Sequence, residues 1–322
     1  MNNREQVRQH YNQHANQHAN FQEAMDNRRK GRAVALKEFH NDIKRIMIKR
    51  FASNADALLD LCCGRGGDII KWFKANVRYV KGVDISEGEV LEASKRFEEQ
   101  KSKMAYRNAK LFAEFEVCDA LGTAEWTDGQ EYDVVTCMFA MHYFFEEEEA
   151  LKVFLHNVAL NLKPGGIFMG TIPCGTRVLQ LLDKRPVFQS EMLKLERRWQ
   201  DGALCQPFGL SYTCAISDTV TEGKGDSEGS SEYLSFMEPV ERILASHGIF
   251  PVRNYDDAEL NNCLDPRDPP DASLKHFAPS FLHSPPSLEA ASALFGMFVF
   301  RKSGAVERPS VLPRDKRMRT DE

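Results

Sequence analysis

The segment 58–71 constrains the fold of this chain more than any other stretch. It reads Leu-Leu-Asp-Leu-Cys-Cys-Gly-Arg-Gly-Gly-Asp-Ile-Ile-Lys, so an apolar run leads into a glycine-rich turn and then into helical spacing. A strand, a glycine turn and a helix are typical of the first unit of a doubly wound α/β fold. Because glycine lets the backbone approach a ligand closely, we expect a binding site at the carboxyl edge of the sheet.

The next apolar run, 79–85, supplies a second part of that site. It contains Asp84, whose carboxylate can accept hydrogen bonds from both hydroxyls of a ribose. A dinucleotide-binding turn reads G-x-G-x-x-G, whereas this turn is Cys62-x-Gly64-x-Gly66-Gly67 and resembles that of AdoMet-dependent methyltransferases. The sequence therefore predicts a nucleoside pocket; the alternative is a tight turn that binds nothing.

Composition restricts the partners and the compartment. The net charge of −5 argues against non-specific coating of nucleic acid, so any such contact must come from a local basic patch. The 8 cysteines include no C-x-x-C pair, which argues against a zinc site. Several of them lie in apolar runs, which favours buried, reduced thiols in an intracellular compartment. No apolar run reaches membrane-spanning length and the N-terminus is too polar for a secretory signal, so we expect a soluble intracellular protein.

The first fifty residues hold the candidate basic patch. Lysines and arginines dominate 28–50, and apolar side chains recur there at helical spacing, which predicts an amphipathic helix with a cationic face. We expect either phosphate contact by that face or an ordinary solvated helix. Further upstream, His10, His14 and His18 would share one helix face, but no carboxylate or cysteine joins them, so we expect no metal site.

The remaining chain continues the α/β alternation up to Pro173 and then departs from it. Expected before Pro173 are helix 88–100, strand 114–118, strand 132–138, helix 146–162 and strand 167–172. Expected after it are helices 177–182 and 189–199, strand 210–220, a polar run 217–231 that does not pack, helix 233–247, a proline-rich loop 266–286, strand 293–301 and a disordered tail 303–322.

Four motifs carry a resemblance to a known family. They are Leu59-Asp-Leu-x-Cys-Gly-Arg-Gly-Gly-Asp-x-x-Lys-Trp72, Phe139-x-x-His-Tyr143, Pro164-Gly-Gly-x-Phe-x-Gly-Thr-x-Pro173 and Glu232-Tyr-Leu. Together they resemble the eukaryotic mRNA cap guanine-N7 methyltransferases, over about 7–302. The resemblance implies a Rossmann-like class I methyltransferase fold: a mostly parallel seven-stranded sheet with helices on both faces.

The resemblance also implies a domain organisation. It consists of a basic helical segment (1–52), an AdoMet-binding core (53–175), an inserted cap-pocket subdomain (176–240) with a flexible loop (217–231), the rest of the core with its closing strand (241–302) and a disordered tail (303–322).

Two sets of site residues follow from the resemblance. The cofactor set, for S-adenosyl-L-methionine (AdoMet), consists of Lys44, Asp60, Cys62, Gly64, Asp84, Asp119, Met138 and Tyr143. The cap set consists of His40, Asn41, Arg65, Lys71, Arg96, His142, Glu232 and Phe295. His142, Tyr143 and Glu232 would position the substrate, with no general base and no metal. Four positions depart from the family pattern: Cys62 replaces glycine, His40 asparagine, Met138 glutamine and Phe295 tyrosine.

The implied reaction is methyl transfer from AdoMet to N7 of the guanine in GpppN at the 5′ end of mRNA. The alternatives are a methyltransferase acting on tRNA or a small molecule, and a catalytically dead RNA-binding scaffold. We expect capped mRNA as partner, with other capping enzymes or an activating subunit as further candidates. The nucleus is the expected location and the cytoplasm the alternative; the basic run 314–319 fits a nuclear address.

Overall fold

The computed structural model describes residues 8–9, 12, 31–103, 106, 108–182, 185–200, 203, 206–219, 221 and 229–304. The histidines predicted to share one helix face, most of the predicted polar loop (222–228) and the predicted tail beyond residue 304 lie outside these residues. Among the residues that the structure describes, no helix has the length and hydropathy needed to cross a bilayer.

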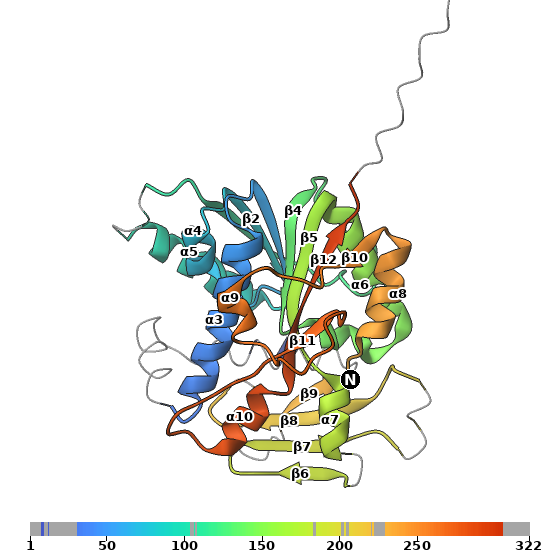
Figure 1. Cartoon of the computed structure of the whole chain (residues 1–322). Coiled ribbons are helices and arrows are strands. Elements are labelled where there is room, and N and C mark those ends of the chain that lie inside the picture. Colours follow the sequence, from blue (N-terminus) through green and yellow to red (C-terminus); the bar gives the residue numbers. More distant parts are fainter. Residues whose placement is uncertain are drawn as a thin grey trace, which may run out of the picture.

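A large twisted sheet organises the molecule (Figure 1). Its strand order is β10-β12-β5-β4-β1-β2-β3, and β11 pairs with β12. The strands are β1 (Ala57–Leu61), β2 (Tyr79–Asp84), β3 (Phe112–Val117), β4 (Tyr132–Met138), β5 (Leu162–Pro173), β10 (Ile249–Pro251), β11 (Leu274–His276) and β12 (Phe295–Lys302). Neighbours from β3 to β5 are parallel, and β12 runs antiparallel to β5. The class I methyltransferase fold is confirmed.

The strand order reverses between β1 and β4, which are neighbours in the middle of the sheet. All five residues of β1 are buried, as expected for a central parallel strand covered on both faces. In open α/β sheets, ligands bind beyond the carboxyl ends of the strands at such a reversal. The topology therefore places the candidate site after β1, β2 and β4.

Helices cover both faces of this sheet (Figure 1). They are α3 (Val34–Phe51), α4 (Ile69–Lys74), α5 (Glu87–Lys101), the 3₁₀ helix η1 (Met141–Glu146), α6 (Glu148–Asn161), α7 (Gly175–Leu182), α8 (Met237–Ser246), α9 (Ala258–Asn261) and α10 (Pro286–Ser292). One core cluster joins the sheet to α3, α4 and α5, and another joins its opposite face to α6 and α8. The predicted amphipathic helix is thus α3, whose apolar stripe packs on the sheet.

A smaller antiparallel sheet lies beside one end of the large one (Figure 1). It consists of β6 (Val187–Gln189), β7 (Leu193–Arg197), β8 (Ser211–Ile216) and β9 (Ser230–Tyr233). The helix predicted over 189–199 is wrong, because Leu193 and Leu195 are buried while Lys194 and Glu196, which alternate with them, are partly exposed. That alternation has the period of a strand.

Three other boundaries were wrong. Ser230 was assigned to an unpacked polar run, yet it is buried in β9 and pairs with Cys214. The helix predicted from residue 233 begins only at Met237, since Tyr233 still belongs to β9. The proline-rich loop 266–286 contains the short strand β11, so the large sheet has eight strands rather than seven. These errors concern strands of 4 and 3 residues, too short for their alternation to be recognised in the sequence.

Candidate active site at the strand reversal

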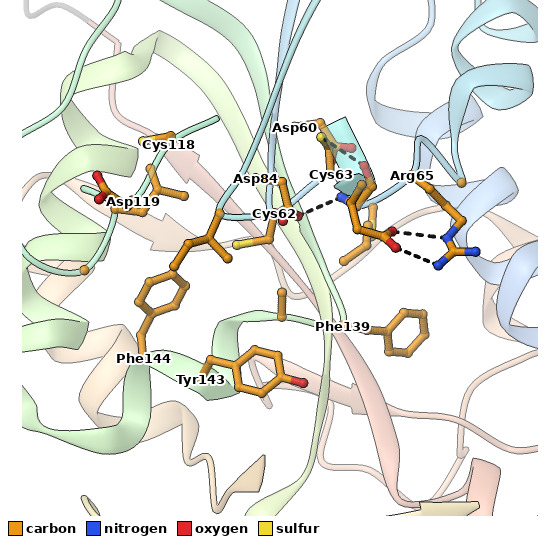
Figure 2. Close-up of a pocket in the computed structure, with 18 of the residues that line it drawn as sticks. Asp60, Cys62, Cys63, Arg65, Asp84, Cys118, Asp119, Phe139, Tyr143 and Phe144 are labelled. Atoms are coloured by element: carbon orange, nitrogen blue, oxygen red, sulfur yellow. Dashed lines mark hydrogen bonds and ion pairs between the residues drawn. The ribbon is translucent and has the colours of Figure 1, made fainter. Parts of the chain in front are cut away.

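A cavity of about 300 Å³ opens beyond the carboxyl ends of β1, β2 and β4. All members of the cofactor set line it. Carboxylates of Asp60, Asp84 and Asp119 lie on one side, and the rings of Phe139, Tyr143 and Phe144 lie on the other (Figure 2). The cavity therefore has polar acceptors facing an aromatic wall, as a nucleoside pocket requires.

The glycine-rich turn forms one end of the cavity. Cys62 has φ 58°, Gly64 has φ 52° and Gly66 has φ 70°. These values lie in the left-handed region, which glycine adopts freely and other residues adopt at a cost of about 1–2 kcal/mol. Gly66 also lacks room for a side chain, because a Cβ there would lie 2.4 Å from Ile69 Cδ1. Cys62 thus keeps the backbone shape of the family's glycine while adding a thiol to the cavity wall.

Asp84 is held by backbone amides at the end of β2. One carboxylate oxygen accepts from the N–H of Gly64 at 2.8 Å, and the other accepts from Ser86 at 2.9 Å (Figure 2). Burial raises the pKa of Asp84, and these amides oppose that rise. Each oxygen keeps a further lone pair for a ligand hydroxyl.

Asp60 lies deeper and is only 4% exposed. Its carboxylate accepts a hydrogen bond from Thr136 Oγ1 at 2.5 Å. Burial, and next the negative charge of Asp68, raise the pKa of Asp60 to about 7. A cationic ligand in the cavity would favour the ionised form of this carboxyl.

A buried ion-pair cluster borders the cavity beside α3. Asp68 Oδ1 lies 2.8 Å from Lys44 Nζ and 2.7 Å from Lys71 Nζ. Burial would raise the pKa of Asp68, but the two ammonium groups hold it well below its usual range. Lys71 also donates to Asn41 Oδ1 at 3.1 Å. Asp68 therefore ties a residue of the cofactor set to two residues of the cap set.

The two arginines of the cap set are also paired with carboxylates. Arg65 makes two contacts with Glu89, at 2.6 Å and 3.1 Å (Figure 2). Arg96 donates to Glu92 at 2.7 Å and is 5% exposed. Arg65 lines the cavity, whereas Arg96 does not. The local charge offered to a phosphate is therefore smaller than the sequence suggested.

The same holds for the cationic face of α3. Carboxylates from other elements pair with its cations: Asp218 with Lys37, Asp68 with Lys44, and Glu259 with Arg45 and Lys49. Lys49 remains 70% exposed, and the pair that it makes is long at 3.9 Å. Phosphate contact by this helix therefore remains a hypothesis for the exposed end of α3 alone.

Glu232 joins the small sheet to the large one. Its carboxylate contacts the Nε2 of His142, and both residues are buried, at 6% and 3% exposure. The His142 ring lies 4.2 Å from that of Tyr143, which lines the cavity. Tyr143, His142 and Glu232 therefore form a row that leads from the cavity into the small sheet. Most glutamates lie on the surface, so a Glu232 that is 6% exposed is unusual.

His40 and Phe295 belong to a cluster of aromatic rings beside Phe139. His40 stacks on Phe139 at 5.1 Å, meets Phe295 edge to face at 5.1 Å, and its Nε2 lies 2.9 Å from Ser292 Oγ. Burial, and next the charge of Lys44, lower the pKa of His40 to about 3, so its ring is neutral near pH 7. The structure thus places His40 and Phe295 in an aromatic cluster behind the cavity wall.

Some residues of the site were not predicted from the sequence. Glu89 of α5 binds Arg65 and Thr136 of β4 binds Asp60, but nothing in their local sequence marks them. Phe139 and Asp68 do lie within the quoted motifs, and both line the cavity. Phe139 has φ 60°, a strained conformation for an aromatic residue and common at ligand sites.

Comparison with known proteins identifies the family. The family model described as the mRNA (guanine-N(7))-methyltransferase domain matches residues 1–223. The chain belongs to this family.

Individual members of the family show the extent of the likeness. The mRNA cap guanine-N(7) methyltransferase of Schizosaccharomyces pombe is 32% identical over 206 residues, which cover 59% of this chain and 54% of that protein. The Saccharomyces cerevisiae protein of the same name is 27% identical over 304 residues, covering 87% and 67%. The chain spans about half the length of the first of these relatives.

Solved structures are more distant. An S-adenosylmethionine-dependent methyltransferase from Clostridium acetobutylicum matches with a TM-score of 0.48 at 16% identity, covering 81% of this chain and 91% of that one.

Proposed function

We propose that this chain transfers a methyl group from AdoMet to N7 of the guanine in the GpppN cap of mRNA. The observation that carries the proposal is the family match over 1–223, which includes every residue that lines the cavity. Glu232 lies beyond the matched residues, so its role rests on its buried contact with His142.

The donor set of the cavity fits AdoMet. Asp84 offers acceptors to the ribose hydroxyls, and Asp119 offers acceptors to the adenine amine. Asp60 offers a negative charge to a cationic ligand, and Lys44 offers an ammonium group to a carboxylate. Bound AdoMet would supply an electrophilic methyl group on a sulfonium.

The protein's own contribution is positioning. Guanine N7 carries a free lone pair and needs no deprotonation before it attacks, so no general base is required. Holding the reactants in line can contribute up to about 7–11 kcal/mol in favourable cases. We assign this task to the row Tyr143, His142 and Glu232, where the carboxylate can accept from guanine N1–H and N2–H₂. The same carboxylate favours the positive charge that develops on the methylated base.

RNA contact and location complete the proposal. The exposed end of α3, with Lys49 and Arg50, is our candidate for phosphate contact. We assign Arg65, Lys71 and Arg96 to the cap phosphates, reached by exchange of their carboxylate partners, and His40, Asn41 and Phe295 to the walls of the guanine site. We place the reaction in the nucleus, with other capping enzymes or an activating subunit as candidate partners.

The test is methyl transfer from labelled AdoMet to RNA that ends in unmethylated GpppN, followed by nuclease digestion. The expected product is labelled 7-methylguanosine. Label on other RNA alone would leave a methyltransferase with a different substrate. No label, in protein that binds AdoMet in a calorimetric titration, would favour a scaffold over an enzyme.

A further inference from the structure

A second cluster of titratable side chains lies outside the cavity, where β5 ends and α7 begins. Cys174 Sγ lies 3.1 Å from His276 Nε2, and His276 Nδ1 lies 2.7 Å from Asp268 Oδ1. The other oxygen of Asp268 accepts from the backbone N–H of His276 at 2.6 Å. Asp268 therefore fixes both the backbone and the ring of His276, with Nε2 directed at the sulfur.

The hydrogen bonds determine where the proton lies. A carboxylate can only accept, so Nδ1 of His276 carries a hydrogen that it donates to Asp268. Nε2 is then the basic nitrogen and can take the proton of the Cys174 thiol. The product of this transfer is a thiolate beside an imidazolium, which Asp268 stabilises from the opposite side.

The start of α7 stabilises the thiolate as well. The backbone amides of Arg177 and Thr176 lower the pKa of Cys174. Burial would raise the pKa of Cys174, but the His276 hydrogen bond, its charge and these amides together lower it. Burial would lower the pKa of His276, but its bonds to Cys174 and Asp268 raise it. The geometry and these directions agree on a thiolate–imidazolium pair.

Two other cysteines are as buried as Cys174 but have no histidine that lowers the pKa of the thiol. Cys118, Cys174 and Cys214 are each 6% exposed. Burial raises the pKa of Cys118 and of Cys214, in the second case with help from the charge of Glu232. These two cysteines therefore serve as internal references that differ from Cys174 in activation and not in exposure.

The arrangement does not suit a metal ion. Cys174 and Asp268 contact opposite nitrogens of the His276 ring, so the three groups form a line and do not converge on one point. Within the described part of the chain, no group of three or more His, Cys, Asp or Glu side chains could hold a metal. A relay of this form is instead the arrangement that activates a thiol nucleophile.

We propose that Cys174 is a modification site: a thiolate, activated by His276 and Asp268, that hydrogen peroxide oxidises to a sulfenic acid. A residue that is 6% exposed admits a small reagent in preference to a bulky one. The sulfur attacks one peroxide oxygen, an S–O bond forms and the O–O bond breaks. The imidazolium of His276 gives its Nε2 proton to the departing hydroxide, so water leaves. Sulfur loses two electrons and the peroxide gains them.

The site lies at the joint between the two sheets. The N–H of Cys174 donates to Leu294 O at 2.7 Å, and the N–H of Gly175 donates to Ser235 O at 2.8 Å. Leu294 precedes Phe295, and Ser235 follows Glu232 in the same short segment. An added oxygen at the sulfur would therefore enter a packed joint next to the residues that we assign to the guanine. This consequence rests on the proposed function, whereas the chemistry of the thiol does not.

The test compares cysteines within one protein. The folded chain is treated with hydrogen peroxide for a set time, the protein is then denatured so that dimedone reaches every sulfenic acid, and each cysteine is quantified by peptide mass spectrometry. Cys174 is expected to be labelled at least about tenfold faster than Cys118 and Cys214, because its pKa is lowered and theirs are raised, so a larger fraction of Cys174 is thiolate. Equal rates at the three cysteines would overturn the proposal.

Variants then separate activation from mere access. In His276→Gln and Asp268→Asn, labelling of Cys174 is expected to fall towards that of Cys214, and its alkylation pH profile is expected to move to higher pH. The titratable and charged groups that face His276, and that therefore influence this pH profile, are Cys174, Asp268 and the cation of Arg177. His247→Gln, a partly exposed histidine beside His156, is the matched control and should leave Cys174 unchanged. An unchanged Cys174 rate in His276→Gln would contradict the proposal, and a misfolded variant would reveal itself by fast labelling at Cys118 and Cys214 as well.

Loss of function provides an independent readout. Peroxide is expected to lower methyl transfer by the wild type and a thiol reductant to restore it, while Cys174→Ser should resist peroxide. If dimedone labels Cys174 but methyl transfer is not detectable even before oxidation, the proposed function fails and the thiol chemistry stands.

Discussion

Four buried carboxylates determine the chemistry of the site at the scale of single residues. Asp60, Asp68, Asp84 and Glu232 are each less than a tenth exposed, yet their partners differ. Asp68 has two ammonium groups, Asp84 has backbone amides, Asp60 has a hydroxyl and Glu232 has an imidazole. Because partners set the ionisation of a buried acid, residues of the same type can perform different tasks.

Glu232 is the residue whose loss should separate substrate binding from cofactor binding. Glu232→Ala is expected to lower kcat/KM for GpppN-RNA by at least about a hundredfold, since it removes a charged acceptor from a buried site. Affinity for AdoMet, measured by calorimetry, should change less than about twofold.

Glu232→Gln is the matched control for Glu232→Ala, because it keeps the shape of the side chain and one acceptor oxygen. It should retain more activity than the alanine variant. Turnover close to that of the wild type in Glu232→Ala would remove Glu232 from the site.

Asp60 should make stability depend on pH in the direction opposite to that of most aspartates. Its pKa is about 7 in the folded protein and about 4 in an unfolded chain, so the folded state holds the extra proton between these values. The free energy of unfolding therefore falls as pH rises from 5 to 8, by about 2 kcal/mol. Denaturant unfolding of the wild type and of Asp60→Asn at both pH values measures this difference.

Asp133 is the control for that measurement. Burial would raise the pKa of Asp133, but hydrogen bonds from Lys163 and backbone amides lower it, so its contribution to stability is lost only below about pH 4. Asp133→Asn should therefore show the same change between pH 5 and 8 as the wild type. If Asp60→Asn lost the same amount of stability between pH 5 and 8 as the wild type, the raised pKa of Asp60 would be contradicted.

At the scale of elements, the turn between β1 and α4 is defined by backbone conformation more than by side chains. Cys62 holds φ 58° in a turn whose other left-handed residues are glycines. The turn brings the Gly64 N–H to Asp84 at 2.8 Å, so the conformation is coupled to the cavity. The thiol of Cys62 forms part of the cavity wall (Figure 2).

Replacement of Cys62 should reveal the strain in this turn. Cys62→Gly is expected to be more stable than Cys62→Ala by about 1 kcal/mol, because only glycine adopts the left-handed conformation freely. The matched pair at Cys137, which lies in β4, should show the opposite order, since glycine weakens a strand. Thermal unfolding of the four variants measures the order of stability at each position. If Cys62→Ala were more stable than Cys62→Gly, backbone strain at position 62 would be excluded.

At the scale of the whole molecule, the proposed function depends on how the small sheet is attached to the large one. The cavity lies at the carboxyl ends of strands of the large sheet, and Glu232 lies on β9 of the small sheet. The attachment includes Gly175, where a Cβ would lie 2.6 Å from Ser235 O and 2.8 Å from Ser235 N. Backbone atoms cannot withdraw as a flexible side chain can, so this position needs glycine.

Gly175→Ala should therefore separate the sheets slightly. We expect a loss of about 1–3 kcal/mol in the free energy of unfolding and a rise in KM for capped RNA larger than any change in AdoMet affinity. Gly304→Ala, which has nothing within 4 Å, is the control. An equal loss of both affinities would show that the joint supports the cofactor cavity as much as the substrate side.

The sequence alone determined the parallel half of the large sheet and the residues that line its cavity. The strand predicted over 132–138 has the bounds of β4, because buried parallel strands leave local patterns of apolar spacing. Most of the cofactor set lies together for the same reason, since its members from β1, β2 and β4 and from the turn after β1 occupy the ends of locally encoded strands.

Only the tertiary structure decided which charges meet. Asp68 on Lys44, Glu89 on Arg65, Glu232 on His142 and His276 on Cys174 are contacts over 24 to 102 residues of sequence. Pairing of that kind depends on the packing of whole elements, and no local period records it. The wrong helix at β7 and the missed strands β9 and β11 have another cause: these strands are 5, 4 and 3 residues long, too short for apolar spacing to identify them.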